Sequence, residues 1–351
     1  PFCGNVETQK RGSRTGEKRY FCPSCKKSFS VNHRQRRLPL WLPHIDGVPE
    51  RKLANEYALS EGIVHKTIVT ELDALPENSG LTLEYANITK YSGILILDGK
   101  YVKVRGYERK IPLLWGLDYL SHDIPVMLLA PSENEEAFSR YFRLLKETGY
   151  RLKIVVVDDR AGIATALKRH FPHALVQLCH VHYLENLRGV LKIRTEGTHL
   201  EFFLKVRELL KVRDFGTLKQ KVSELLLRYE HTNMLYTQIM LGVWGRRREL
   251  FAYLLVPDCP NNTNLIELYN SHLNGRLKTV KGFKSFHSAN RWLNGYVVRR
   301  RTKELTDCEG RFKHLNGRCS LEIAAKDVVA VRKLKDKLGG KREKNAPEIE
   351  R

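Results

Sequence analysis

Long apolar runs are missing from the sequence. A membrane-spanning helix needs about 20 consecutive apolar residues, whereas every aliphatic stretch here is shorter and soon meets a charged residue. The basic-then-apolar pattern of a secretory leader is also missing. Because the chain begins with Pro1 rather than Met, we expect residues to precede it in the natural protein. The composition, with 42% hydrophobic residues, indicates a soluble globular protein without a membrane partner.

Acidic residues are few relative to basic ones. The chain has 61 Lys and Arg against 39 Asp and Glu, a net charge of +22. The segment from Leu268 to Lys303 contains nine Lys or Arg and no acidic residue. A solvated helix face normally mixes both signs, so this segment favours a polyanion partner, most generally nucleic acid. An anionic membrane surface fits the charge as well, but no amphipathic anchor accompanies it.

The seven cysteines lack the even, regular spacing of a secreted disulfide framework. PFCGN contains Cys3, and YFCPSCKKSFS contains Cys22 and Cys25 in a Cys-Pro-x-Cys turn, which brings two thiolates to one tetrahedral zinc. The first stretch is typical of a second such knuckle, whose first cysteine we expect before residue 1. The sequence therefore predicts a zinc ribbon, with His33 a poor fourth ligand. The alternative is free thiols in a basic loop.

A pair of short helices is predicted after the ribbon. Pro49 suits the first turn of one helix, and Ser60 can cap a second that runs through Ile63, Ile68 and Leu72. Following a basic arm, the pair is typical of a helix-turn-helix that binds DNA, although many helix pairs bind nothing. The DNA contacts expected here are Arg34, Arg36, Arg37 and Lys66.

From residue 92 the pattern changes to strands and helices. Strands are predicted at 94–104, 111–119, 124–129, 152–157 and 174–178, with helices at 133–148 and 162–170. This order predicts an α/β fold with a ribonuclease H-like core, a mixed five-stranded sheet with helices. In that topology the first and fourth strands are neighbours.

Aspartates stand where those two strands are expected to end. ILILDGKYVKV carries Asp98 after an apolar run, and Asp158 and Asp159 follow the fourth strand. Carboxylates at one sheet edge repel each other unless cations neutralise them. Two Mg²⁺ ions roughly 4 Å apart would resolve the conflict and form a clamp for phosphoryl transfer. Turn chemistry is the ordinary alternative for each aspartate alone, and strand periodicity does not choose between Asp158 and Asp159.

The stretch VVVDDRAGIATALKRHFPHALVQLCHVHYLENL resembles the central block of Mutator-like insertion-sequence transposases of the DDE type. The resemblance runs from Gly93 to Arg301, and the ribbon and helix pair resemble the DNA-binding front of zinc-binding bacterial and archaeal variants. It implies that Asp98 is the first acid. The second, four residues before a Gly-Ile pair, is Asp158, although Asp159 stands where glycine is usual.

The same resemblance assigns supporting residues and the third acid. Cys179 and His182 match a Cys-x2-His pair that supports the site; a hydrogen-bonding brace is favoured over a metal half-site or a packed strand end. NNTNLIELYNSHLNGRLKTVKGFKSF resembles the last block of the family, which implies Glu267 as the third acid. Its alternative role is to close a capping box with Asn264. The weaker rivals for the third acid are Glu185 and Glu304.

Between the second and third acids, the sequence resembles an all-helical insertion. Trp244 in WGRRREL is predicted either to stack on a distorted DNA end or to anchor a helix in the core. Further phosphate contacts are expected from Arg246, Arg247, Arg248, Arg276, Lys278, Lys281, Arg299, Arg300 and Arg301. The expected organisation is a zinc ribbon (1–33), a helix-turn-helix domain (34–80), the first part of the core (81–189), the insertion (190–258), the last part of the core (259–331) and a charged tail (332–351).

The predicted function is that of a DNA transposase. It binds terminal inverted repeats, cleaves DNA at the element's ends and transfers 3′ strands to target DNA. Asp98, Asp158 and Glu267 would hold two Mg²⁺ or Mn²⁺ ions, and Cys3, Cys22 and Cys25 a structural Zn²⁺. The expected partners are double-stranded DNA and further copies of the chain, in a dimer or larger synaptic complex at the cytoplasmic nucleoid. The alternatives are a non-catalytic DNA-binding protein derived from a transposase and a structure-selective nuclease with the same core.

Overall fold

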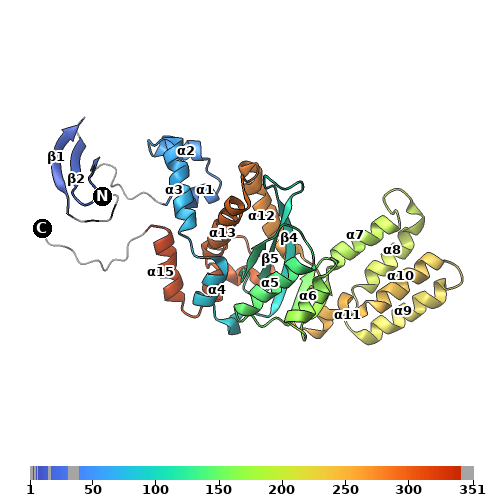
Figure 1. The fold of residues 1–351 in the computed structure, drawn as a ribbon. Coiled ribbons are helices and arrows are strands. Elements are labelled where there is room, and N and C mark those ends of the chain that lie inside the picture. The colour runs from blue at the N-terminus through green and yellow to red at the C-terminus, as the bar shows by residue number, and fades with distance from the viewer. Residues whose placement is uncertain (1–2, 4, 6, 15–16, 31–38, 341–351) are drawn as a thin grey trace.

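The computed structural model of the chain describes residues 3, 5, 7–14, 17–30 and 39–340 (Figure 1). The first elements form a small antiparallel sheet of three strands: β1 (Gln9–Arg14), β2 (Glu17–Cys22) and β3 (Lys27–Ser30). Cys22 ends β2, and the turn to β3 contains Cys25. His33 and the basic arm with Arg34, Arg36 and Arg37 lie outside the described residues.

A helical group follows. It consists of α1 (Trp41–Ile45), α2 (Glu50–Glu56), α3 (Glu61–Asp73) and α4 (Asn78–Tyr85). The predicted cap of α3 is confirmed, because the Ser60 hydroxyl accepts a hydrogen bond from the Ile63 amide. Pro49 is the N-cap of α2, one position before the predicted first turn. Helix α3 runs through Ile63, Ile68 and Leu72 as predicted; Ile68 and Leu72 are buried, whereas Ile63 is 52% exposed.

The helix pair packs on a long helix from the other end of the chain. A Cβ atom on Gly295 would lie only 2.5 Å from Leu72 Cδ2, so the missing side chain lets α3 approach α13 (Phe286–Thr302) closely. Arg291 of α13 also pairs with Asp73 at the end of α3. The two α-helices are therefore docked both by close packing and by an ion pair.

The five strands predicted for the core are present, each somewhat shorter than expected. These strands are β4 (Ile94–Val102), β5 (Ile111–Asp118), β6 (Met127–Leu129), β7 (Ile154–Val157) and β8 (Leu175–Leu178). They lie in the order β6-β5-β4-β7-β8; β4 is antiparallel to β5 and parallel to β7. This mixed five-stranded α/β arrangement confirms the predicted adjacency of the first and fourth strands and is consistent with a nuclease-like core.

Alternating side chains of β4 pack into two layers of helices. Leu95 and Leu97 point into the apolar cluster that contains α5 (Glu135–Glu147) and α6 (Ile163–His170). Ile94 and Ile96 point into the opposite cluster, with α12 (Asn264–Val280) and α13. Asp98 continues the second series, so its side chain faces α12.

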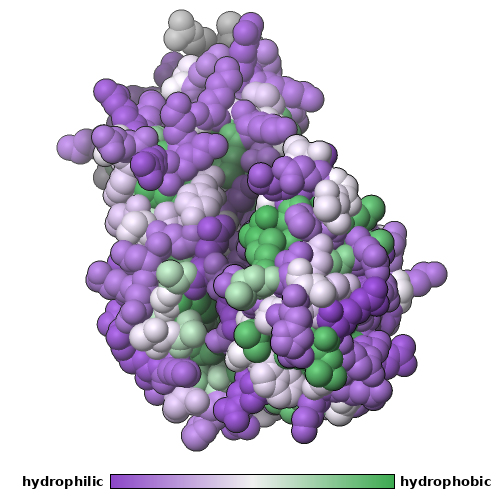
Figure 2. Space-filling model, turned by 90° about the vertical axis from the view of Figure 1, so that its right-hand side faces the viewer, coloured by the Kyte–Doolittle hydropathy of each residue, from purple (hydrophilic) through white to green (hydrophobic). Residues whose placement is uncertain are grey.

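The chain between β8 and α12 is helical. Its elements are α7 (His180–Val190), η3 (Gly197–His199), α8 (Leu200–Leu209), α9 (Phe215–Tyr229), α10 (Met234–Gly245), α11 (Arg247–Leu250) and η4 (Ala252–Leu255). They enclose an apolar cluster of their own that includes Phe202, Val206 and Met240. The face of the molecule on the right of Figure 1 is mostly hydrophilic, with separate hydrophobic patches (Figure 2). The segment from 180 to 255 thus brings its own core and projects from the sheet (Figure 1).

Short elements complete the described chain: η2 (Ile88–Lys90), η5 (Gly310–Leu315), α14 (Ser320–Ile323) and α15 (Val328–Leu338). The predicted boundary at residue 331 falls inside α15, so the helix continues into the predicted tail. Within the described ranges, no helix combines the length and apolar character required to cross a membrane.

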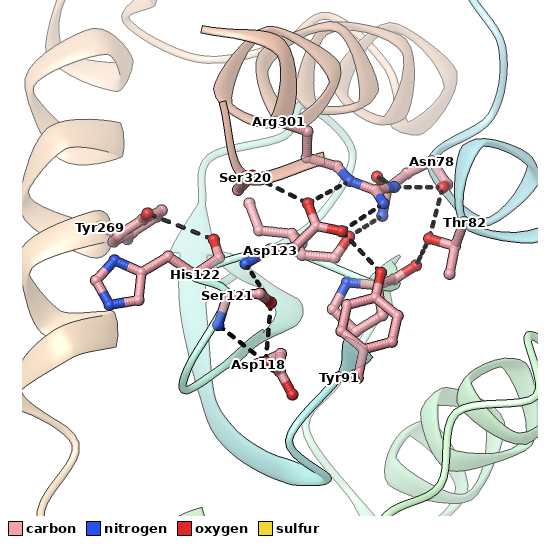
Figure 3. Close-up of polar contacts among 12 residues, drawn as sticks. Asn78, Thr82, Tyr91, Asp118, Ser121, His122, Asp123, Tyr269, Arg301 and Ser320 are labelled. Carbon is pink, nitrogen blue, oxygen red and sulfur yellow. Dashed lines mark hydrogen bonds and ion pairs between the residues drawn. The ribbon is translucent and has the colours of Figure 1, made fainter. Parts of the chain in front are cut away.

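A buried polar cluster joins α4, the β5–β6 turn, α13 and α14 (Figure 3). At its centre the Arg301 guanidinium donates to both carboxylate oxygens of Asp123, at 2.9 and 2.7 Å, and both side chains are fully buried. Tyr91 and Ser320 also donate to Asp123, and Arg301 donates to Asn78. The prediction that Arg301 contacts DNA phosphate is therefore wrong, because its guanidinium is buried in the core and paired with Asp123.

Candidate active site

The parallel pairing of β4 and β7 brings two aspartates to one place. The register pairs Ile94 with Ile154 and Ile96 with Val156. Two residues further along both strands, the same register sets Asp98 beside Asp158. Asp98 does not end its strand as predicted, because β4 continues to Val102 in its hairpin with β5. It lies instead where the parallel neighbour β7 stops. On one side the backbone of Asp98 is therefore paired with β5, and on the other side the pairing with β7 has ended.

Asp98 is held by hydrogen bonds on both oxygens. Oδ1 accepts from the backbone amide of Gly99 at 2.7 Å, and Oδ2 accepts from Nδ2 of Asn270 on α12 at 2.6 Å. Burial, reinforced by the neighbouring Asp158 carboxylate, raises the pKa of Asp98 from 3.8 to about 6. The rise means that the protein alone does not offset the negative charge at this point.

Asp158 and Asp159 diverge, as neighbours on an extended chain must. Asp158 lies with the other acids: its Oδ1 is 2.5 Å from Nδ1 of His182, and the Glu267 charge contributes to its raised pKa, which burial chiefly causes. Asp159 turns to the helical segment and pairs with Arg246. The hydrogen bonds from Arg246 lower the pKa of Asp159. The structure thus brings Asp158, and not Asp159, to Asp98.

Glu267 reaches the same place from the first turns of α12. Its Oε1 accepts a hydrogen bond from the Thr263 hydroxyl at 2.9 Å and lies 3.9 Å from Nε2 of His182. The Thr263 hydroxyl also lies 3.2 Å from Sγ of Cys179 and 3.4 Å from Nδ1 of His182. Cys179 is the N-cap of α7, so the ends of two helices meet at one hydroxyl. The Thr263 hydroxyl thus links Cys179 and His182 to Glu267.

The contacts of Glu267, Glu185 and Glu304 bear on which of them is the third acid and on whether Glu267 only closes a capping box. Thr263, rather than Asn264, is the N-cap of α12. The backbone N–H of Asn264 donates to Oδ1 of Asn262, so the alternative capping box between Asn264 and Glu267 is not formed. Among the rivals, Glu185 pairs with Arg188 and Arg194, and Glu304 with Lys335. Of the three glutamates, Glu267 is the one in contact with the residues around Asp158.

The donor set fits divalent cations that prefer oxygen. Asp158 Oδ1 is buried, and Nδ1 of His182 lies 2.5 Å from it. Carboxylate oxygens are the ligands that Mg²⁺ and Mn²⁺ prefer. Asp158, Cys179 and His182 also offer ligand atoms within 4.8 Å of one another, which leaves a half-site with softer donors as an alternative.

A further acid at the site, Glu133, is not among the residues predicted from the sequence. Its charge adds to the raised pKa of both Asp98 and Asp158, and it accepts a hydrogen bond from the Tyr101 hydroxyl. In the sequence it is one of several acids at the start of a predicted helix, where acids are common. Only the fold, which sets it beside β4, distinguishes it.

The second candidate metal site lies in the N-terminal sheet. The thiols of Cys3, Cys22 and Cys25 offer sulfur atoms within 4.8 Å of one another. A backbone hydrogen bond from Cys25 is the main cause that lowers the pKa of Cys22 to about 7. Thiolates at this spacing suit Zn²⁺. A fourth ligand is not found within the described part of the chain.

The predicted DNA contacts lie in different environments. Lys66, Arg248, Lys278 and Lys281 are exposed, whereas Arg246, Arg247, Arg276, Arg299 and Arg300 are half-buried. Arg299 pairs with Asp46, and Arg300 lies over the ring of Tyr269. Trp244 packs against the core of the helical segment and carries Arg247 over its ring at 4.4 Å, which favours the anchoring role.

Similarity to known proteins agrees with this architecture. Residues 81–305 match the family described as "Transposase, Mutator family". The chain is also similar to the transposase for insertion sequence element IS256 in transposon Tn4001, from Staphylococcus aureus and from Enterococcus faecalis (strain ATCC 700802 / V583). Each of these is 23% identical over 308 residues, which cover 84% of this chain and 77% of the relative.

A shorter similarity links the chain to the transposase for insertion sequence element ISRM5 of Rhizobium meliloti (strain 1021). It is 25% identical over 214 residues, 58% of this chain and 52% of that protein. The resemblance inferred from the residues is thus confirmed at the level of the family. Because the family match covers well over half of the sequence, the chain belongs to the Mutator family of transposases.

Proposed function

We propose that the chain is a DNA transposase that cleaves the ends of its own element and transfers the 3′ strands to target DNA. The observation that carries the proposal is the meeting of Asp98, Asp158 and Glu267: Asp158 and Glu267 both lie beside His182, and the Asp158 charge adds to the raised pKa of Asp98. These acids come from β4, the end of β7 and α12. Such convergence of carboxylates is unfavourable without cations.

The three carboxylates would hold two Mg²⁺ or Mn²⁺ ions. When bound, such ions activate a water and stabilise the attacking and leaving oxygens of an in-line displacement at phosphorus. His182 and Thr263 orient Asp158 and Glu267 through the contacts at the start of α12. No protein nucleophile is needed, so strand transfer uses the 3′ hydroxyl of the cut DNA itself.

The remaining parts of the chain bind and position DNA. Cys3, Cys22 and Cys25 hold a structural Zn²⁺ together with a fourth ligand from outside the described residues. This ribbon and the α2–α3 pair read the terminal repeats, with Lys66 exposed on α3. Basic side chains along α12, such as Lys278, contact phosphates. Joining two ends needs two sites, so the protein acts as a dimer or larger complex on DNA of the cytoplasmic nucleoid.

One assay tests this function directly. The donor is the genomic segment that carries this coding sequence with the DNA on both sides of it, labelled at its ends. It is incubated with the full-length protein, Mg²⁺ and a supercoiled target plasmid, with EDTA in place of Mg²⁺ as the control. Mg²⁺-dependent joined products support the proposal. Cut but unjoined ends indicate a nuclease, and a shifted band alone indicates a DNA-binding protein; either result overturns the proposal.

A further inference from the structure

A chain of hydrogen bonds leads from the middle of the sheet to the first acid. The indole N–H of Trp115 on β5 donates to Oδ1 of Asn270 at 3.0 Å, and Nδ2 of Asn270 donates to Oδ2 of Asp98 at 2.6 Å. Trp115 is fully buried, and Asn270 is 7% exposed. Trp115 is also the antiparallel partner of Asp98 in the register of β4 and β5. The three side chains therefore lie on one face of the sheet, against α12.

Trp115 determines which way the Asn270 amide faces. An indole N–H can only donate, so it requires the amide oxygen, and the amide NH₂ must then face Asp98. The reversed amide would set two donors against each other at Trp115 and two acceptors against each other at Asp98. In a buried place such unmet groups are costly. The direction of the hydrogen bond to Asp98 is therefore fixed two side chains away.

Asn270 also links two acids through one helix. It follows Glu267 by three residues on α12, and residues at this spacing share a helix face. The same turn thus carries one acid and the donor that orients another. With Gly99 on Oδ1 and Asn270 on Oδ2, each Asp98 oxygen keeps one hydrogen bond and a free lone pair.

We propose that Asn270 is a positioning residue for Asp98 and that Trp115 acts through Asn270 to fix its direction. The inference rests on the proposed function, because it assigns Asp98 to divalent ions. Partners that orient a metal-binding carboxylate affect metal affinity or activity by about 10–100-fold when they are removed. A purely structural role, satisfying the buried indole and anchoring α12, would instead affect folding and DNA binding together.

The test uses four variants of the full-length protein: Asn270→Leu, Trp115→Phe, the two combined, and Asn274→Leu. The last is the matched control, because Asn274 is exposed one turn further along the same helix. Mn²⁺ binding is measured without DNA by electron paramagnetic resonance of the free ion. Cleavage against Mg²⁺ concentration, DNA affinity and the melting temperature are measured beside it.

Asn270→Leu is expected to weaken Mn²⁺ binding or slow cleavage by about 10–100-fold with unchanged DNA affinity. Trp115→Phe keeps an aromatic ring in the core but removes one buried hydrogen bond. It should weaken Mn²⁺ binding or slow cleavage by about 2–10-fold. The combined variant should match Asn270→Leu alone, because Trp115 acts only through Asn270. The control should match the native protein.

Three results would overturn the inference while the native protein binds Mn²⁺ and cuts DNA. These are native behaviour of Asn270→Leu, additive losses in the combined variant, and equal losses of DNA affinity and metal binding. If Asn270→Leu does not fold, Trp115→Phe decides alone, and its unchanged metal binding and cleavage would refute the role. A native protein that neither binds Mn²⁺ nor cuts would contradict the proposed function instead.

Discussion

Two groups of buried carboxylates in this molecule differ in how their charge is met. Asp123 lies against Arg301 and accepts hydrogen bonds from Arg301, Tyr91 and Ser320 (Figure 3). Burial acts to raise the pKa of Asp123, but the Arg301 guanidinium and these hydrogen bonds hold it below the ordinary value. At the candidate active site, burial and the neighbouring acid leave the pKa of Asp98 raised to about 6.

This difference in pKa separates the structural carboxylate Asp123 from the carboxylates of the candidate active site. The fold supplies Asp123 with a cation of its own, so the charge of this carboxylate is balanced without a ligand. Around Asp158, the fold supplies further acids, and burial keeps the pKa of Asp158 raised although His182 and Arg160 act to lower it. A site that stores uncompensated negative charge is prepared for cations from solution.

The largest expected effect comes from neutralising Asp158. Asp158→Asn should lower Mg²⁺-dependent cleavage by about 1,000-fold or more, because a metal clamp contributes several kcal/mol to the transition state. DNA affinity and the free energy of unfolding should not fall, because like charges are relieved. Asp159→Asn is the matched control: its partner Arg246 is half-exposed, and cleavage should remain close to native. Comparable losses in both variants would contradict the choice of Asp158.

Neutralising Asp123 should have the opposite profile. Asp123→Asn leaves Arg301 buried without its counter-charge and should lower the free energy of unfolding by about 3–5 kcal/mol. The measurement is denaturant unfolding of the full-length protein. Asp258→Asn makes the same change at the exposed pair with Arg311 and should cost less than about 1 kcal/mol. Equal stability of the two variants would remove the distinction between the clusters.

The raised pKa of Asp98 predicts a pH dependence of stability. In EDTA the folded protein holds this proton up to about pH 6, whereas the unfolded chain releases it near 3.8. The folded state therefore binds more protons between these values, and the contribution of this group to stability falls as pH rises through them. Asp98→Asn should flatten that part of the melting profile, whereas Asp159→Asn should not. An unchanged slope in Asp98→Asn would show that the carboxyl is not perturbed.

The sheet and two of the acids could be predicted from the sequence. The β-branched run before Asp158 and the alternating residues around Asp98 are strong local signals of strands. Their meeting followed from strand order alone, because the first and fourth strands of this topology are neighbours. The choice of Asp158 over Asp159 depended on the family resemblance, since strand periodicity favours neither residue.

The contacts that complete the site could not be predicted in this way. Arg301 ends a run of three arginines in a basic segment, which in the sequence looks like a surface; its partner Asp123 is 178 residues away. Asn270 and Glu133 likewise carry no local pattern that separates them from ordinary helix residues. Partnerships of this kind arise only when the chain has folded, because they depend on which faces of α12, α13 and β4 meet.

The smallest expected effect concerns DNA binding and contrasts exposed and buried positions in the same basic segment. Lys278 is exposed on α12, so Lys278→Gln should remove one phosphate contact. The slope of log affinity against log salt should then become shallower by about 0.9, because one counterion fewer is released. Arg301→Met removes a charge of the same sign from the buried cluster, and it should leave the slope of the folded protein unchanged. Fluorescence anisotropy with labelled duplex DNA at several salt concentrations measures both, and a shallower slope for Arg301→Met would show that the buried charge also binds DNA.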